Sequence, residues 1–473
     1  MKTPHDIVME NFDFPYTFRP FQVEDTDAAA EVPAFGNYAD PGLGKTAQAL
    51  AVSAYLKHEM GTDRMIVTTP PVVFESWARS IKAITEKQYG KPRPYMFYRG
   101  TPAQRAKLRD QWSDAEIVIM TNDILKRDYE HVGNFVDDFS PCFAIDEAHA
   151  IKNYQSDTHK AVKGITAGLP VNLLTGSPTL KPEDCYGYMR FTNPNAYRNF
   201  SHFLRCHVAD EDAYGNAKEY KDLDLLQKNF LHNAVRRRKR DHLKDLPQVQ
   251  YIPIFYDLES AHVKLYNDLA EQRLLEVENG EAIDALSTSR LTHALQQIVV
   301  NYDHFSGNPM KESNSLRIVE EVLDEIGDEK LLVVGVYRMT NDLLIKKFAH
   351  VNAVAIYGGM SNTQRDEALN RFVNDPKCRM LVIQPRAGGV GLDGLQHVCS
   401  EMLFLECPST PMEFWQSTGR LDRGGQSSPV NCRIAVANKT LQVRRHRQLL
   451  ENDEMVVQLE GGTQDLRKMI YGE

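Results

Sequence analysis

Apolar residues in the first 175 positions form short, continuous runs that do not alternate with polar residues. Such runs are typical of strands that are buried on both faces of a parallel sheet. Polar, helix-forming stretches separate the runs, so the pattern predicts a chain that alternates strand and helix. The expected strands of this half span residues 34–39, 65–69, 116–120, 142–145 and 171–174.

The second half of the chain repeats this plan, and the stretch between the halves, residues 197–326, is mainly polar and helical in pattern. We therefore expect an α/β protein with two mostly parallel sheets, each flanked by helices, and a helical insertion between them. The expected domains are residues 1–235, a basic junction at 236–262 with the boundary between the lobes near Pro247, and residues 263–473. The expected strands of the second half span residues 330–336, 354–357, 379–383, 402–405 and 431–436.

Composition narrows the class of protein. A chain of 473 residues with 42% hydrophobic and 25% charged residues suits two globular domains. No apolar run approaches the roughly 20 residues that span a bilayer, and the amino terminus lacks the features of a signal peptide. Seven scattered cysteines without a CxxC pair argue against a disulfide framework and structural zinc. We expect a cytoplasmic protein without a membrane partner.

The net charge of −9 does not indicate binding to nucleic acid. It does not exclude such binding either, because a local basic groove matters more than the total charge.

A phosphate-binding loop stands at residues 39–46, with the sequence ADPGLGKT. Gly42 and Gly44 allow the backbone to wrap closely around phosphates and to point N–H groups at the anion. Lys45 can reach the outer phosphates, and the Thr46 hydroxyl can bind Mg²⁺. Because the loop follows an apolar run and precedes a helix, it predicts a nucleoside triphosphate site.

Two further segments complete this chemistry. Asp146 ends an apolar run, where it can hold Mg²⁺, and Glu147 can orient and deprotonate an attacking water. Arg420 and Arg423 lie three residues apart, so on a helix they share one face and can act as arginine fingers on the transferred phosphate. They can do so only if a second domain folds over the same nucleotide.

In order, these segments resemble the superfamily-two helicases, and more narrowly the Swi/Snf-type DNA-translocating ATPases. The resemblance covers about residues 18–436. The narrower assignment rests on the run RRRK before Leu246-Pro247, and on residues 386–392 and 416–426. Read alone, that basic run is a solvated charged surface. The segments that match the family's motifs are residues 18–22, 39–46, 67–70 with Trp77, 146–149, 175–178, 236–247, 386–392 and 416–426.

The resemblance implies two RecA-like lobes, ATP and Mg²⁺ as substrate and cofactor, and movement along DNA. It implies nucleotide contacts from Gln22, Gly42, Leu43, Gly44, Lys45, Thr46, Gly391 and Asp393, and coupling through Thr175, Ser177 and Gln416. It implies contacts to nucleic acid from Thr69, Trp77, Thr121, Asn122, Gly358, Gly359, Arg386 and Trp415. For Trp77 and Trp415, packing in the core is an equally weighted alternative.

The chain departs from the family pattern at three places. Ala39, Asp40 and Pro41 replace the usual Asp-Glu-Met before the first glycine of the phosphate loop. Gln384-Pro385 stand where the family carries hydroxyl side chains, which puts hydroxyl contacts to the DNA backbone in doubt. Asp422 occupies a position where the family often has histidine.

Three functions stay open at this point. The leading one is a monomeric ATPase motor that tracks on duplex DNA, with RNA polymerase or a replication or repair factor as the kind of protein partner that would suit it. The second is an RNA-directed helicase with the same two lobes. The third is a nucleotide-dependent regulatory module without turnover. Strand separation, remodelling of forks or D-loops and displacement of bound proteins are not distinguished by the sequence.

Overall fold

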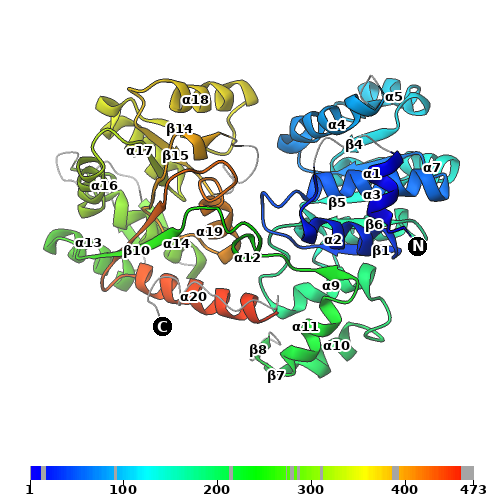
Figure 1. Ribbon diagram of the computed structural model, residues 1–473. Coiled ribbons are helices and arrows are strands. Elements are labelled where there is room, and N and C mark those ends of the chain that lie inside the picture. Colours follow the sequence, from blue (N-terminus) through cyan, green and yellow to red (C-terminus); the bar gives the residue numbers. More distant parts are fainter. Residues whose placement is uncertain are drawn as a thin grey trace. The chain divides into compact units, whose positions relative to one another are not determined.

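The computed structural model describes residues 2–459, apart from 12–16, 90–92, 212–216, 273, 277–281, 285–287, 309–312, 386–391 and 393. The chain divides into two compact units. The first extends to Lys244, and the second runs from Asp245 to Glu454. From Met455 the end of the last helix groups with the first unit. Figure 1 draws the chain from blue to red along the sequence.

A seven-stranded parallel sheet forms the centre of the first unit, in the order β3-β4-β2-β5-β6-β1-β9. Its central strands are buried along their whole length, which explains why their sequences are continuous apolar runs. The strands are β1 (Ala34–Asn37), β2 (Met65–Thr68), β3 (Tyr95–Phe97), β4 (Ile117–Met120), β5 (Cys142–Asp146), β6 (Val171–Leu174) and β9 (Ala234–Val235).

Alternate residues of each central strand enter two different cores. In β2, for example, Ile66 packs in one cluster while Met65 and Val67 pack in the other. One cluster is covered by α1 (Pro4–Asn11), α2 (Pro20–Ala30), α3 (Lys45–Met60) and α4 (Phe74–Tyr89). The other is covered by α6 (Asn122–Arg127), α7 (Tyr129–Phe139), α8 (Asp157–Ile165), α9 (Pro182–Thr192), α10 (Phe200–His207) and α11 (Leu223–Phe230).

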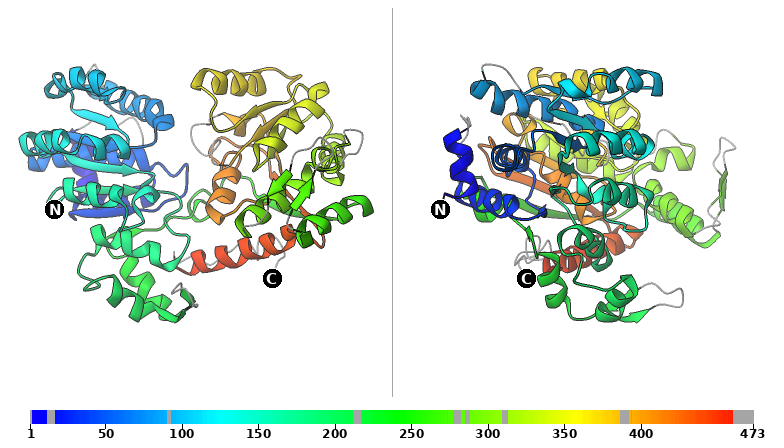
Figure 2. Two further views of the ribbon diagram at one scale, coloured as in Figure 1. Left: turned by 180° about the vertical axis from the view of Figure 1, so that it is seen from behind. Right: turned by 90° about the vertical axis from the view of Figure 1, so that its right-hand side faces the viewer.

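Smaller elements complete the first unit. Helices α1 and α2 lie together beside α3 (Figure 2). A hairpin, β7 (Val208–Glu211) and β8 (Ala217–Tyr220), lies with α10 and α11 (Figure 1). The remaining elements are α5 (Pro102–Arg109), α12 (Lys239–His242) and the 3-10 helices η1 (Pro71–Val73), η2 (Trp112–Asp114) and η3 (Ala148–Ile151).

The second unit contains a six-stranded parallel sheet in the order β10-β17-β16-β13-β15-β14. Helices α16 and α17 pack on one face, and α18, α19 and α20 pack on the other. The strands are β10 (Val249–Tyr256), β13 (Leu331–Val334), β14 (Val354–Ile356), β15 (Met380–Ile383), β16 (Glu401–Phe404) and β17 (Val430–Ala437).

The helices of the second unit are α13 (Ser260–Gln272), α14 (Thr288–Val300), α15 (Tyr302–Ser306), α16 (Asn314–Glu325), α17 (Arg338–Lys347), α18 (Asn362–Asn374), α19 (Pro411–Thr418) and α20 (Leu441–Leu459). Short pieces add the hairpin β11 (Leu274–Glu276) and β12 (Ala282–Asp284), η4 (Ala349–Val351) and η5 (Leu395–His397). Among the described residues, no helix has the length and apolarity needed to cross a bilayer.

The predicted α/β architecture is confirmed, and each of the ten expected strands forms within its predicted range or within one residue of it. The prediction missed three strands of the two sheets: β3, β9 and β10. Strand β10 lies inside the segment expected as a junction, and it pairs with β17 along all eight residues. Its side chains are mostly only partly buried and it contains Pro253, as suits an edge strand rather than a buried run.

Glu406, just after β16, is an acidic residue of the second unit whose side chain is buried. Its carboxylate accepts hydrogen bonds from the backbone N–H groups of Val336 (2.6 Å) and Tyr337 (3.0 Å), and from the Thr340 hydroxyl (2.7 Å). Burial outweighs these donors and raises the pKa of Glu406 from 4.5 to about 7.

This pKa shift predicts a pH dependence of stability. Between pH 4.5 and about 7 the unfolded chain loses the Glu406 proton while the folded chain keeps it, so this group's contribution to stability falls as pH rises. Glu406→Gln should therefore gain stability over the wild type, by up to about 3 kcal/mol, between about pH 5 and about pH 8. Urea unfolding at both pH values tests this, with the exposed Glu321→Gln as control. A wild-type-to-variant difference that is the same at both pH values contradicts the assignment.

Candidate active site

The phosphate loop connects β1 to α3, and both of its glycines have left-handed backbones. The φ angles are 89° at Gly42 and 84° at Gly44, a region that other residues rarely adopt. A Cβ at Gly44 would lie 2.4 Å from Nε2 of Gln22, so the end of that side chain would have to move. Since α3 begins at Lys45, its free N–H groups face the loop and favour an anion.

Lys45 spans the loop. Its Nζ donates to the carbonyl of Ala39 at 2.6 Å and lies 3.3 Å from that of Asp40. Burial lowers the pKa of Lys45, and the nearby carboxylates of Glu147 and Asp146 oppose that effect. The amine is therefore held inside the loop, where it can exchange backbone carbonyls for phosphate oxygens.

Gln22, one of the expected nucleotide contacts, touches this loop directly. It lies in the first turn of α2, where its Oε1 accepts the Arg19 N–H at 2.8 Å. Its Nε2 donates to the Leu43 carbonyl at 3.0 Å. The side chain therefore fixes α2 against the phosphate loop.

Asn37 and Gln48, which the sequence analysis did not single out, brace the base of the loop. The Asn37 amide donates to Gln48 of α3 and accepts the Ala39 N–H at 3.3 Å, while its backbone carbonyl accepts the Thr175 N–H at 3.2 Å. Both side chains are buried. The available signal was a polar residue at the end of an apolar strand, together with a glutamine in an otherwise apolar helix face.

Asp146 ends β5, and its carboxylate is held by three donors. Oδ2 accepts the Trp77 indole N–H at 2.8 Å and the Thr69 hydroxyl at 3.1 Å, and Oδ1 accepts the Glu147 N–H at 3.0 Å. Burial raises the pKa of Asp146, and the neighbouring Glu147 charge acts in the same direction. A bound cation would relieve both effects.

The same contacts correct the role expected for Thr69 and Trp77. Both side chains are only 1% exposed, so neither presents a surface to a nucleic acid. Instead they orient the carboxylate of Asp146 from inside the core. For Trp77, the packing alternative is the correct one, with the indole N–H as its functional contribution.

Glu147 has a left-handed backbone, with φ 51° and ψ 49°. For a residue with a Cβ this conformation costs about 1–3 kcal/mol, and such strain gathers at functional turns. The turn leads into η3, and Oε2 of Glu147 lies 3.1 Å from Nδ1 of His149. The fold therefore maintains a strained geometry at the proposed general base.

The basic run that we call the basic strap, residues 236–239, is bound to the phosphate loop. Arg236 contacts Oδ1 of Asp40 at 2.7 Å and donates to the Tyr38 carbonyl at 2.6 Å. The Lys239 N–H donates to Oδ2 of Asp40 at 2.9 Å. Burial alone would raise the pKa of Asp40, but Arg236 and Arg238 outweigh it and lower the pKa to about 2.

Arg237 of the same strap contacts helix α2, at 2.6 Å from Asp25 and 3.0 Å from Glu24. The strap is therefore not a solvated basic surface, because its three arginines each contact a carboxylate. The basic strap also explains how the phosphate loop accommodates Asp40, one of the three departures from the family pattern. The aspartate at position 40 is compensated by arginines that come from the end of the first unit.

The expected coupling segment, residues 175–178, lies against the phosphate loop. Thr175 is buried, and its hydroxyl accepts the Ser177 N–H at 3.2 Å. A Cβ at Gly176 would lie 2.8 Å from Cδ of Pro41, so the two segments are in close contact. Thr121, expected to contact nucleic acid, caps α6 by accepting the Ile124 N–H at 3.1 Å. Asn122 is half-buried beside it.

In the second unit, Gln384 follows β15 and bridges the ends of β13 and β14, the two strands that flank β15. Its Oε1 accepts the Gly358 N–H and its Nε2 donates to the Val336 carbonyl, both at 3.0 Å. Gly359 is exposed and has a φ of 92°. The departure at position 384 therefore fixes the loop that carries the two glycines. Arg386, Gly391 and Asp393 lie outside the described residues.

Trp415, expected to contact DNA, packs at the edge of the core. Its indole N–H donates to Asp453 of α20 at 2.6 Å, and its ring meets Phe414 edge-on at 5.5 Å and Tyr251 at 6.2 Å. These contacts support the packing alternative, and Trp415 is half-buried. Gln416, the next residue, is half-buried near the end of α19.

Arg420 and Arg423 do not share a helix face, because α19 ends at Thr418. The hydroxyls of Ser417 and Thr418 bond back to carbonyls four residues earlier, at 2.7 and 3.0 Å, and the chain continues in tight turns. Arg420 is 9% exposed, and Nη1 of Arg423 lies 3.5 Å from the Leu392 carbonyl. Their spacing is therefore set by turns rather than by helical periodicity.

Two family models match the chain. The SNF2-related domain matches residues 38–303, and the helicase conserved C-terminal domain matches residues 314–425. The first of these alone covers more than half of the chain.

Individual relatives are more distant. Human TATA-binding protein-associated factor 172 is 24% identical over 481 residues, which cover 85% of this chain and 25% of that protein. The corresponding factor MOT1 of Saccharomyces cerevisiae is 25% identical, with the same two coverages. Mouse chromodomain-helicase-DNA-binding protein 1-like is 24% identical over 89% of this chain and 47% of its own length. The chain thus spans between a quarter and a half of the length of these relatives.

Among solved structures, the Sulfolobus solfataricus SWI2/SNF2 ATPase core in complex with double-stranded DNA is 22% identical to this chain. The alignment covers 98% of both chains, with a TM-score of 0.43.

Proposed function

Because this chain belongs to the SNF2-related family, we propose that it is a DNA-stimulated ATPase that tracks on duplex DNA. The observation that carries the proposal is the meeting of the phosphate loop with Asp146 and Glu147 at the carboxyl ends of the strands of one sheet. Ligands of open α/β sheets bind at this edge. The charges of Glu147 and Asp146 both act to raise the pKa of Lys45, in the loop.

The residues at this edge fit ATP with Mg²⁺. Asp146 and Thr46 offer a carboxylate and a hydroxyl, the hard oxygen ligands that Mg²⁺ takes together with phosphate oxygens. Bound there, Mg²⁺ would neutralise charge on the phosphates. The space around Gly42, where a Cβ would meet nothing within 4 Å, leaves room for a phosphate to approach the backbone.

We assign each step of hydrolysis to residues of this chain. Lys45 and the N–H groups of the loop bind the β- and γ-phosphates. Glu147 accepts a proton from the attacking water, and Asp146 holds the geometry of the turn beside it. Arg420 and Arg423 are proposed to neutralise charge on the transferred phosphate, the role that the family resemblance implies.

The proposed track is duplex DNA, held mainly by its phosphates. Thr121, Asn122, Gly358, Gly359 and Arg386 remain the proposed contacts. Two relatives named TATA-binding protein-associated factors support action on protein–DNA complexes, so we propose displacement of bound proteins as the outcome of tracking. Binding through phosphates predicts low sequence preference and weakening by salt.

Steady-state ATP hydrolysis tests this function. The rate is measured without nucleic acid and with duplex DNA, single-stranded DNA or RNA, and Lys45→Ala serves as the blank. Strong stimulation by duplex DNA supports the proposal. Preference for single strands favours a conventional helicase, preference for RNA favours the RNA-directed alternative, and no turnover under any condition favours the regulatory module.

Trp77→Phe tests the support of Asp146. Phenylalanine keeps an aromatic ring in the core but is smaller than tryptophan and removes the donor at 2.8 Å, so Asp146 loses one of its three hydrogen bonds. We expect the Mg²⁺ concentration for half-maximal ATP hydrolysis to rise by about 10-fold, as for other residues that orient a metal ligand. Trp415→Phe, in the second unit, is the matched control. An unchanged Mg²⁺ dependence contradicts this role for Trp77.

A further inference from the structure

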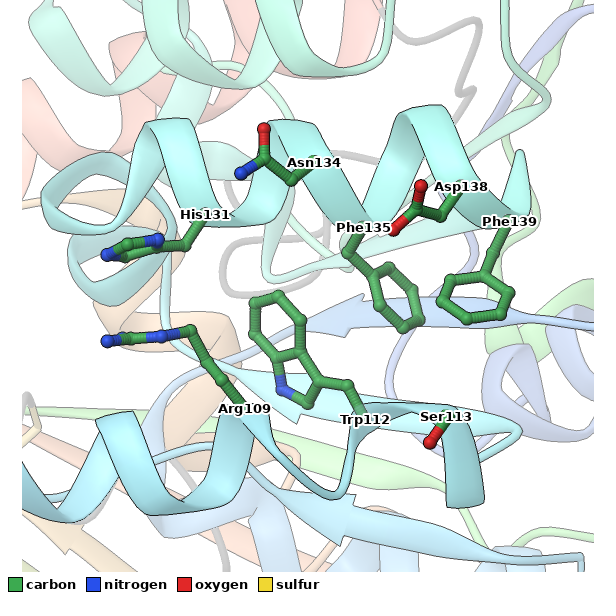
Figure 3. Close-up of a pocket in the computed structure, with 8 residues that line it drawn as sticks. All are labelled: Arg109, Trp112, Ser113, His131, Asn134, Phe135, Asp138 and Phe139. Carbon is green, nitrogen blue, oxygen red and sulfur yellow. The ribbon is translucent and has the colours of Figure 1, made fainter.

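A cavity of about 290 Å³ opens between α7 and η2 in the first unit (Figure 3). Aromatic rings form its wall and polar side chains stand around its mouth. The wall consists of Trp112, Phe135 and Phe139, and the polar group includes Arg109, His131 and Asp138. The functions proposed above do not use any of these side chains.

The cavity lies at the opposite edge of the sheet from the candidate active site. The turn η2 precedes β4, and α7 precedes β5, so the cavity is near the amino-terminal ends of both strands. The phosphate loop and Asp146 are at the carboxyl ends of β1 and β5. A ligand in this cavity would therefore leave the nucleotide site open.

The aromatic wall is preformed. The ring of Trp112 meets Tyr98 edge-on at 4.9 Å and Phe135 at 5.1 Å, and Phe135 contacts Phe139 at 4.8 Å. Trp112 is 7% exposed and Phe135 is 3% exposed, so only part of each ring faces the cavity. The space suits an apolar side chain that inserts between the helix and the turn.

The charges at one end favour an anion. Arg105 binds the Asp128 carboxylate through two nitrogens, at 2.7 and 2.9 Å, and these two charges compensate each other. Arg109 lies farther from Asp128, at 3.7 Å, and donates to the neutral Tyr98 hydroxyl at 3.0 Å. One carboxylate thus faces two guanidinium groups, which leaves positive charge at the Arg109 end of the cavity, away from Asp138.

Figure 3 shows His131 of α7 directly opposite Arg109 at this end of the cavity, and Asp138 at the far end beside Phe139. The two nitrogen-bearing side chains thus flank one position where a carboxylate could accept hydrogen bonds from both sides. The side chain of Asn134, also on α7, lies between the two ends of the cavity, where it could bond to a peptide backbone.

We propose that this cavity binds a peptide segment of a protein partner in which an acidic residue stands next to an aromatic one. The aromatic ring fills the space against Trp112 and Phe135, and the carboxylate lies between Arg109 and His131. The proposal is independent of the ATPase activity, because it rests on the cavity alone. It gives the first unit a docking site for a protein partner that stays available while nucleotide is bound.

Fluorescence anisotropy with labelled peptides tests the proposal on the full chain. The probe is Gly-Asp-Phe-Asp-Gly, and its controls are Gly-Lys-Phe-Lys-Gly and Gly-Asp-Ala-Asp-Gly. We expect saturable binding of the probe with a Kd of about 0.1–1 mM. The Kd of each control peptide should be at least about 10-fold higher. Equal binding of the acidic and basic peptides overturns the proposal, as does a lack of saturation up to about 10 mM.

A variant with altered charge tests whether the probe peptide binds in this cavity. His131→Glu places a carboxylate at the cavity mouth. The affinity for the probe peptide should therefore fall by about 10-fold or more. His350→Glu, the same change at an exposed position of the second unit, should leave probe binding unchanged. A cooperative thermal melt at the wild-type temperature shows that His131→Glu is folded. Unchanged probe affinity in that folded variant overturns the proposed site.

Discussion

Glu147→Gln should lower the rate of ATP hydrolysis by about 10²–10⁴-fold while ATP affinity changes little. Glutamine keeps the size of the side chain and tolerates the same strained turn, but it cannot accept a proton from water. The contacts that bind phosphate come from the loop and Lys45, and this substitution leaves those groups in place. Single-turnover hydrolysis measures the first effect, and equilibrium binding of a fluorescent ATP analogue measures the second.

The control for this experiment is Glu130→Gln, the same change at an exposed residue of α7. It should leave both hydrolysis and binding at the wild-type level. Normal turnover in Glu147→Gln would remove Glu147 as the general base. A parallel loss of ATP affinity would instead indicate that Glu147 supports the bound nucleotide in its ground state.

Arg236→Ala should lower the free energy of unfolding by about 3 kcal/mol, because it leaves the Asp40 carboxylate beside the phosphate loop without its nearest cation. The side chain of Arg236 is 4% exposed, so water cannot readily replace it. The substitution also removes the hydrogen bond to the Tyr38 carbonyl. Urea unfolding measures the loss, with Arg198→Ala at an exposed position as control.

A double-mutant cycle separates the ion pair from the packing of the arginine. In an Asp40→Asn background, Arg236→Ala should cost clearly less than in the wild type. The pH dependence provides a second check. The pKa of Asp40 is lowered from 3.8 to about 2, so its stabilising contribution is present above pH 3.8 and is lost as pH falls towards 2. Additive effects of the two substitutions would show that the pair does not hold the strap.

The sequence predicted the elements that depend on local patterns. Continuous apolar runs located the central strands, and two glycines before Lys45 located a loop that the structure builds with positive φ angles. These features can be read in advance because burial on both faces, and a backbone that only glycine adopts, each restrict the residue types directly.

Features that depend on distant partners were not predictable in the same way. The basic strap looked like a solvated run, because its acidic partners Asp40, Glu24 and Asp25 lie some 200 positions earlier in the chain. Trp77 of α4 has an indole donor whose acceptor, Asp146, ends strand β5, 69 positions later in the chain. Strand β10 escaped prediction because an edge strand needs neither a continuous apolar run nor the absence of proline.

We propose that ATP hydrolysis drives movement of this protein along duplex DNA. Displacement of a third strand tests this movement most directly. A duplex carries a labelled triplex-forming strand, and its release is followed with ATP, with a non-hydrolysable analogue and with Glu147→Gln. We expect release with ATP alone, while the two strands of the underlying duplex stay paired. Duplex-stimulated ATP hydrolysis without release of the third strand would contradict tracking.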